Sequence, residues 1–281
     1  MKNTRYTELE KKGVPEEEID VIKQFDSISK NKLITFRLNE KNRIYKLSTN
    51  RCGTPFIPDK IENLKKLEIL FISESEIKEL PESIGKLLKL RDLSISRSSI
   101  KLVPENIGYL PNLKAFGVIN SKLTSFPIQI CVISSLESLQ LTNNRISVLP
   151  ECIGNLKNLE TIFFDENSLQ EIPSSFCQLK NLQRLSMENN KLKELPESFG
   201  NLTMLHELFL TCNQLRELPE SFGKLKNLFS LKLNRNQFEE FPDVIQHLRL
   251  THLDISENDI KHYPKIAGKF NLKMRKEGIY F

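Results

Sequence analysis

Proline recurs in this 281-residue sequence with a strict period. Nine of the 13 prolines are spaced 23 residues apart, and Pro264 follows the last of them by 22; the nine are Pro58, Pro81, Pro104, Pro127, Pro150, Pro173, Pro196, Pro219 and Pro242. A fixed period of this length indicates a repeat architecture, because each repeat is a small unit that buries its apolar side only by stacking on its neighbours. The chain is therefore predicted to form an elongated coil of stacked units.

A second pattern, LxxLxLxxNxL, runs in phase with the prolines and is clearest at Leu182, Leu185, Met187, Asn190 and Leu192. The pattern resembles the leucine-rich repeat family over about residues 44–272. Its unit is similar to the 23-residue LxxLxLxxNxLxxLPxxIGxLxx type of many bacterial proteins and of intracellular Ras-associated repeat proteins. The resemblance implies an α/β fold: a leucine-rich-repeat horseshoe solenoid with a parallel β-sheet on the concave face, short 3-10 or α turns on the convex face, and terminal caps.

Each position of the unit has a physical reason. In the LxL segment alternate side chains point to one side, which predicts a short strand with buried leucines. The Asn that follows can donate and accept hydrogen bonds where the chain turns. Proline suits the start of a helical turn, and Gly four residues later, as in Gly200, is expected to supply the backbone freedom needed to leave that turn. The first four units carry Cys52, Ser75, Ser98 and Ser121 in place of Asn, which predicts a less rigid N-terminal half.

The repeat phase also predicts the domain organisation. Residues 44–271 are assigned to ten leucine-rich repeats in a single domain. Residues 1–43 are assigned to an N-terminal cap, because 14–25 is an amphipathic helix opened by Pro15 and 33–38 with 44–47 reads as a β-hairpin. Residues 272–281 are assigned to a basic C-terminal cap that contains a closing hairpin.

Composition and charge exclude several classes of protein. The chain is 39% hydrophobic and 27% charged, which is typical of folded proteins, and no run of about 18 apolar residues predicts a membrane span. The net charge of +5 lies in residues 261–281, where lysines are expected to keep a sheet edge soluble rather than to bind nucleic acid. The N-terminus lacks the apolar stretch of a signal peptide, which favours the cytoplasm unless a signal has been removed. Five scattered cysteines without CxxC spacing argue against a disulfide framework or zinc site and favour a reducing compartment.

No motif for catalysis or for a cofactor is present. The sequence has no GxSxG, no phosphate-binding glycine loop and no HExxH, so the protein is predicted not to be an enzyme and to need no cofactor. Two weaker alternatives remain open. His252, Asp254 and Glu257, near His262, are a candidate surface metal site, and Cys212 is a candidate nucleophile for which the repeat phase supplies no base.

The predicted binding surface is the concave face. The residue between the two strand leucines is Phe71, Phe163 or Phe209 in three units, where a solvated strand normally carries a polar residue. Phe163 and Phe209 would stand about 10 Å apart. They are predicted to form a protein-binding centre, together with Arg184, Asp165, Glu188 and Glu207 on the same face. Ile69 and Phe71 form a second apolar cluster near the N-terminal end, with Ala115 and Ile119 farther along.

These residues favour a non-enzymatic interaction module that binds a protein on its concave face. Because Glu160, Asp165, Glu166, Glu188 and Glu207 make the centre of that face acidic, the partner is expected to have a basic rim. The alternatives are a structural role for the aromatic side chains as cross-strand contacts, an exported surface protein or effector that engages host proteins, and a metal-binding or enzymatic module. No nucleic acid or membrane partner is expected, and a monomer is favoured.

Overall fold

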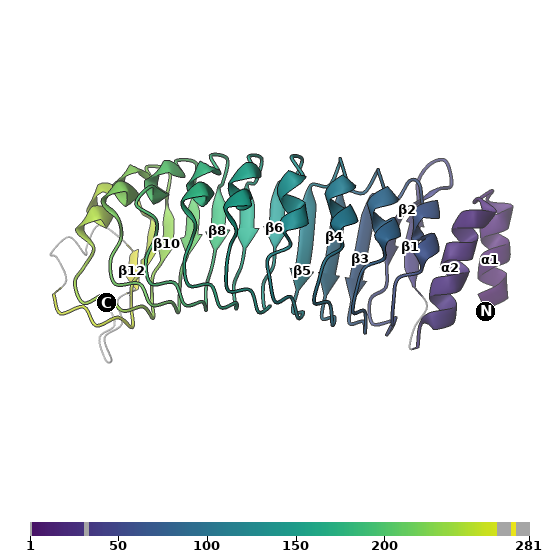
Figure 1. The fold of residues 1–281 in the computed structure, drawn as a ribbon, viewed down its shortest axis with the longest axis horizontal. Coiled ribbons are helices and arrows are strands. Elements are labelled where there is room, and N and C mark those ends of the chain that lie inside the picture. The colour runs from purple at the N-terminus through teal and green to yellow at the C-terminus, as the bar shows by residue number, and fades with distance from the viewer. Residues whose placement is uncertain (1, 31–33, 263–270, 274–281) are drawn as a thin grey trace. The chain divides into compact units, whose positions relative to one another are not determined.

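The computed structural model describes residues 2–30, 34–262 and 271–273. The chain divides into two compact units, residues 1–136 and 137–281, which we describe one at a time. Both units consist of stacked coils in which short strands alternate with short 3-10 helices (Figure 1). Within the described residues, no helix has the length and apolar character needed to cross a lipid bilayer.

Unit 1 begins with two α-helices and continues into five strands. The helices are α1 (Lys2–Lys11) and α2 (Glu16–Ile28), and the strands are β1 (Thr35–Leu38), β2 (Ile44–Ser48), β3 (Ile69–Ser73), β4 (Asp92–Ser96) and β5 (Ala115–Ile119). Strands β1 and β2 pair antiparallel, whereas β2 to β5 pair parallel in sequence order. The 3-10 helices are η1 (Asp59–Asn63), η2 (Glu82–Lys86), η3 (Glu105–Tyr109) and η4 (Ile128–Val132).

The helix α2 and the β1–β2 hairpin occur where the sequence predicts a helix and a hairpin, whereas α1 was not predicted. Figure 1 shows α1 and α2 side by side at the N-terminal end, and Leu9 of α1 packs in a small core with Val14 and Ile19. Two fully buried carboxylates fix this region. Asp26 accepts hydrogen bonds from Arg5, Tyr6 and the backbone N–H of Ile34, and Glu18 accepts from Arg43 and the backbone N–H of Ile44; the donor–acceptor distances are 2.6–3.2 Å.

Unit 2 contains seven strands and five 3-10 helices. The strands are β6 (Ser138–Gln140), β7 (Thr161–Phe163), β8 (Arg184–Ser186), β9 (Glu207–Phe209), β10 (Ser230–Lys232), β11 (His252–Asp254) and β12 (Asn271–Lys273), all parallel and paired in sequence order. The 3-10 helices are η5 (Glu151–Asn155), η6 (Ser174–Gln178), η7 (Phe199–Asn201), η8 (Glu220–Lys224) and η9 (Asp243–His247). The central residue of each strand from β6 to β11 is buried.

The asparagines bind adjacent coils of unit 2 together as the sequence predicts. Asn190 is buried and donates through Nδ2 to the carbonyl oxygens of Met187 and Glu188 in its own coil and of Phe164 in the preceding coil. Its Oδ1 accepts from the backbone N–H of Leu169. The same pattern recurs at Asn167, Asn213, Asn236 and Asn258. The Glu188 carbonyl also accepts from the backbone N–H of Glu166, whereas the partners of the other groups come from the asparagine ladder.

In unit 1 serine replaces asparagine and forms fewer bonds. Ser98 and Ser121 share one hydrogen bond of 2.9 Å between their hydroxyl groups, and the buried Oγ of Ser75 has no hydrogen-bond partner within the described chain. This difference is the physical basis for the predicted lower rigidity of the N-terminal repeats, which stays a prediction.

The repeated glycines have a different role from the one predicted. None of those in the 3-10 helices has a positive φ. Instead, a Cβ on Gly85, Gly154 or Gly200 would overlap the backbone carbonyl of the following coil. The glycine therefore allows neighbouring turns to pack closely, and the explanation from backbone freedom is wrong.

The left-handed backbone conformation lies elsewhere, in the residue that precedes the Asn, Ser or Cys of each repeat. Its φ is between 49° and 57° in every repeat. The column consists of Arg51, Glu74, Arg97, Asn120, Asn143, Glu166, Asn189, Cys212, Arg235 and Glu257. Only the Asn members belong to a residue type that adopts this conformation readily, so the coil geometry imposes it on the others.

The predicted leucine-rich-repeat fold class is confirmed by these coils. The boundaries at residues 43 and 271 stay predictions, and the predicted C-terminal hairpin lies mostly outside the described residues; β12 pairs parallel with β11. Cys131 and Cys152 are disulfide-bonded, whereas Cys52, Cys177 and Cys212 form no disulfide. The expectation of cysteines without disulfides is therefore wrong at two positions.

Candidate functional site

The open face of the sheet is formed by the strand side chains that point away from the core. Strand pairing aligns these side chains in columns that cross the strands. In unit 2 the column that contains the predicted aromatic residues is Gln140, Phe163, Ser186, Phe209, Lys232 and Asp254. The register therefore places Phe163 and Phe209 in one column with a single strand between them.

Phe163 and Phe209 are both half-buried, while the strand residues on either side of them, Ile162, Phe164, Leu208 and Leu210, are buried. The predicted inside–outside phase is thus correct. Ser186 lies between the two rings in the column and is 4% exposed. Strand spacing places the two phenylalanine side chains about 10 Å apart, with the small Ser186 side chain between them in the column. We call these three residues the phenylalanine slot.

Cations and ion pairs border the phenylalanine slot. The Nζ atom of Lys232 lies 4.7 Å from the ring centroid of Phe209, in cation–π contact, and covers this ring from the β10 side. Arg184 and Glu207, in the neighbouring column, form an ion pair with an Nε–Oε2 distance of 2.5 Å. Toward β8 the register pairs Phe209 with Ser186, which has a small side chain. Phe209 is only half-buried, so part of its side chain is open to contact.

The acidic residues predicted around the slot do not all remain available. Asp165 is half-buried, and its Oδ1 accepts hydrogen bonds from the Ser186 hydroxyl and from the backbone N–H of Glu188 at 2.8 Å. Because Asp165 fixes the coil after β7, its first role is structural. With Glu207 paired to Arg184, the carboxylates left for an external cation near the slot are Glu188 and the exposed Glu160 and Glu166.

The second predicted cluster lies on the open face of unit 1. Ile69 and Phe71 are half-buried, and the Nζ of Lys46 lies 4.9 Å from the Phe71 ring centroid. Sequence reasoning missed Asp92, which faces Ile69 on β3 and Ala115 on β5. Burial raises the pKa of the Asp92 carboxyl, and the nearby Lys46 charge partly offsets this. The repeat phase was sufficient to place Asp92 between these two apolar residues.

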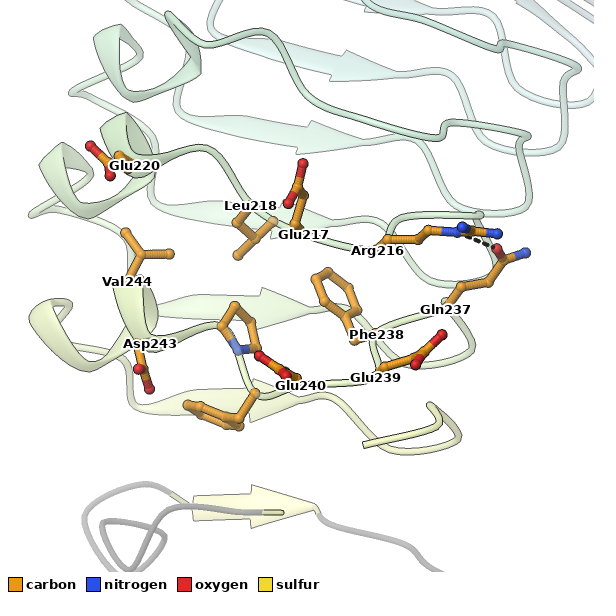
Figure 2. Close-up of a pocket in the computed structure, with 12 residues that line it drawn as sticks. Arg216, Glu217, Leu218, Glu220, Gln237, Phe238, Glu239, Glu240, Asp243 and Val244 are labelled. Atoms are coloured by element: carbon orange, nitrogen blue, oxygen red, sulfur yellow. Dashed lines mark hydrogen bonds between the residues drawn. The ribbon is translucent and has the colours of Figure 1, made fainter. Parts of the chain in front are cut away.

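A separate hollow of about 380 Å³ lies on unit 2 away from the strands, along the segments that lead into η8 and η9 (Figure 2). Its lining is acidic and includes Glu217, Glu220 and Asp243, and Arg216 donates to Gln237 at one end with an Nε–Oε1 distance of 3.3 Å. None of the residues predicted from sequence lines this hollow.

The alternative metal site is not assembled. In the part of the chain that the structure describes, no three His, Cys, Asp or Glu side chains gather to hold a metal ion. Asp254 accepts hydrogen bonds from the backbone and hydroxyl of Ser256, and Glu257 pairs with Arg235 at 2.7 Å. Cys212 is half-exposed and forms no disulfide. Its thiol interacts with Arg235, whose pKa is raised mainly by the hydrogen bond to Glu257 and to a smaller extent by Cys212.

Family models and solved structures with the same repeat match the chain. A leucine-rich repeat region model matches residues 128–214 and a leucine rich repeat model matches residues 203–260. A search of curated proteins by sequence finds no match.

Among solved structures, a leucine-rich-repeat protein of Leptospira interrogans is 28% identical, with a TM-score of 0.79 over 92% of this chain and 69% of the other. A plant peptide hormone receptor, solved in complex with RGF2, is 27% identical with a TM-score of 0.61. A TDR receptor is 30% identical with a TM-score of 0.65. Each of these two alignments covers 72% of this chain, but the chain spans only 38% and 37% of the two receptors.

Proposed function

The chain belongs to the leucine-rich-repeat family, and we propose that it is a non-enzymatic module that binds a protein partner through the open face of its sheet. The phenylalanine slot of unit 2 is the proposed centre. Proteins of this fold commonly mediate protein–protein interaction, and the plant receptor among the similar structures is a receptor for a peptide hormone. The finer assignment to the bacterial 23-residue class stays a prediction.

The single observation that carries the proposal is the partial exposure of Phe163 and Phe209 in one column of the open face. Half-buried phenylalanine rings add apolar contact area to the sheet, but solvent-facing strand positions are usually occupied by polar side chains. A partner that inserts an apolar side chain above Ser186 would remove water from the facing sides of both rings. Large aromatic residues in such partly enclosed positions are typical of the residues that dominate binding energy.

The charges at the slot support a partner with basic groups at its edge. Glu160, Glu166 and Glu188 are carboxylates on this face that are not engaged by a described ion pair. Lys232 and Arg184 are already in contact with Phe209 and Glu207. Charge complementarity at an interface rim mainly raises the association rate and the specificity, so we expect binding to weaken as salt increases.

The test is a double variant, Phe163→Ala with Phe209→Ala, used as bait in a native lysate beside the unchanged protein. The matched control is Phe241→Ala, a half-buried phenylalanine of the same unit that lines the acidic hollow instead of the sheet. We expect the double variant to lose a captured protein that both the unchanged chain and the control retain, with little change in melting temperature. If the melting temperature falls and capture is retained, the two rings are cross-strand packing and the proposal is wrong.

The location of the protein is a separate proposal. The sequence predicts the cytoplasm, whereas disulfide-bonded Cys131 and Cys152 favour an oxidising compartment, in agreement with the alternative of an exported protein. Fractionation of native cells with immunodetection decides between them, because recovery outside the cytoplasm supports export and recovery with cytoplasmic markers excludes it.

A further inference from the structure

Asp92 occupies an unusual position on the open face of unit 1, between two apolar neighbours. The register pairs it with Ile69 of β3 on one side and Ala115 of β5 on the other. We propose that Asp92 binds one positively charged side chain, Arg or Lys, from an extended segment of a protein partner. The alkyl part of that side chain would pack on Ile69 and Ala115, and its charged end would meet the carboxylate.

The carboxylate of Asp92 lacks a partner of its own. No hydrogen bond or ion pair to its side chain is found within the described residues, although it is half-buried. Burial is also the main cause of its raised pKa. A partly desolvated carboxylate without a cation is unfavourable, and an incoming cation restores the lost interaction. The two fully buried carboxylates of unit 1, Glu18 and Asp26, are both hydrogen-bonded to arginine.

Lys46 is the nearest internal candidate to pair with Asp92, but its position prevents this. In the register Lys46 faces Ile69, and Ile69 faces Asp92, so the apolar side chain stands between the two charges. The ammonium group is instead held over the Phe71 ring at 4.9 Å. Lys46 therefore lowers the pKa of Asp92 through space without forming an ion pair.

The neighbouring column leaves room for the incoming side chain. Beside Asp92 on the same face, the register aligns Phe71, Ser94 and Gly117. Ser94 is small and Gly117 has no side chain, so the face is low next to Asp92 and rises at Phe71. A long side chain of the partner could therefore lie along the sheet over Ser94 and Gly117 and end at the Asp92 carboxylate. Phe71, with the Lys46 ammonium group over its ring, would border this side chain on one side.

The other charges around Asp92 do not reproduce this contact. Arg91 comes directly before β4, and Glu68 and Lys114 come directly before the strands on either side, β3 and β5. Residues 1–136 contain 23 Lys and Arg against 17 Asp and Glu, so unit 1 repels cations at long range. That repulsion is screened beyond about 8 Å in physiological salt, whereas a desolvated contact is screened much less. We therefore expect the charge of unit 1 to slow association more than it weakens the bound state.

This inference rests on the proposed function only in taking the open face as the binding face. It is tested on the full chain with two synthetic probes, acetyl-Leu-Ser-Arg-Ser-Leu-amide and the same peptide with neutral citrulline in place of arginine. Carboxyl carbon NMR of the labelled protein follows Asp92 during each titration. We expect the arginine peptide to bind about tenfold more tightly, as for one charge-assisted contact, and to lower the pKa of Asp92.

Asp92→Asn should reduce this preference to about equal affinity for the two peptides without lowering the melting temperature. The matched control is Asp59→Asn, an exposed carboxylate on η1, which should keep the tenfold preference. The inference is wrong if Asp92→Asn keeps the preference, or if Asp92 shows no response to about 10 mM arginine peptide, a concentration above the Kd expected for such a contact. The phenylalanine slot is tested separately by capture, so either result at Asp92 leaves that test intact.

Discussion

The side-chain oxygen of Asn190 accepts a hydrogen bond of 3.0 Å from the backbone N–H of Leu169, in the preceding coil of unit 2. The amide nitrogen of the same side chain donates to three carbonyl oxygens at 3.0–3.2 Å. One buried side chain therefore bonds four backbone groups, and for the Leu169 N–H it is the one partner found within the described residues. The stacking of coils depends on this polar ladder as well as on the leucines.

Asn190→Ala should destabilise the protein strongly. The substitution leaves the Leu169 N–H without a described partner, which costs about 1–3 kcal/mol, and it removes one of the two hydrogen bonds that each of the carbonyl oxygens of Phe164, Met187 and Glu188 accepts. We expect a loss of about 2–4 kcal/mol, measured by urea unfolding followed by circular dichroism. Lys191→Ala, at the next and exposed position, is the matched control and should change the stability by less than about 0.5 kcal/mol. A small effect of Asn190→Ala would mean that water replaces the amide.

Two glycines at the same repeat position should respond differently to alanine. A Cβ on Gly200 would overlap the backbone carbonyl of Ser221, which cannot move without displacing the next coil. A Cβ on Gly223 would meet the Val244 side chain at 3.1 Å and the Val244 carbonyl at 3.8 Å, so a small side-chain shift relieves it.

We therefore expect Gly200→Ala to cost more than about 2 kcal/mol in unfolding experiments and Gly223→Ala less than about 1 kcal/mol. Equal losses of stability in the two variants would contradict the explanation from close packing of neighbouring coils.

Much of the fold was predictable because the repeat phase fixes which side chains are buried. The phase correctly placed Leu208 and Leu210 inside and Phe209 on the open face, and the asparagine ladder followed from amide chemistry. The role of glycine was mispredicted because a one-coil pattern contains no information about how closely the next coil approaches. Helix α1 was missed because its residues show no apolar stripe, and contacts such as Arg5 with Asp26 hold it.

The site was predictable only as a set of positions. The repeat phase alone put Phe163, Arg184 and Glu207 on one face. It could not predict the ion pair between Arg184 and Glu207 or the hydrogen bond that Asp165 accepts from the Glu188 N–H, because both depend on side-chain geometry. The repeat phase also places Asp92 on the open face, but the residue was overlooked. A carboxylate on a solvated face is ordinary, and Asp92 becomes notable only once its neighbours across the strands are known to be apolar.

Glu166→Asn should stabilise the chain. Glu166 has a φ of 54°, a left-handed conformation that strains most side chains and that Asn tolerates better. Its side chain is exposed and forms no described ion pair, so little is lost. We expect a gain of about 0.5–1 kcal/mol in urea unfolding, against no gain for Glu160→Asn, an exposed control outside the left-handed column. Equal effects at both positions would show that the change in charge is responsible.

The stability of the N-terminal helices should depend on pH in the alkaline range. Burial and the 2.9 Å hydrogen bond that Tyr6 donates to Asp26 raise the pKa of Tyr6 from 10.0 to about 12. Above pH 10 the unfolded chain releases the phenol proton while the folded chain retains it. The stabilisation linked to this proton is therefore fully present below pH 10 and is lost as the pH rises toward 12.

Unfolding by urea at pH 9, 10 and 11 should show this loss in the unchanged chain, and Tyr6→Phe isolates it from the titration of other groups. The variant should be less stable than the unchanged chain at pH 9, because the buried Asp26 loses one donor, and the difference should shrink by pH 11. Tyr109→Phe, which alters an exposed ring of unit 1, should follow the unchanged chain at every pH. A gap between Tyr6→Phe and the unchanged chain that stays constant from pH 9 to pH 11 would contradict the raised pKa.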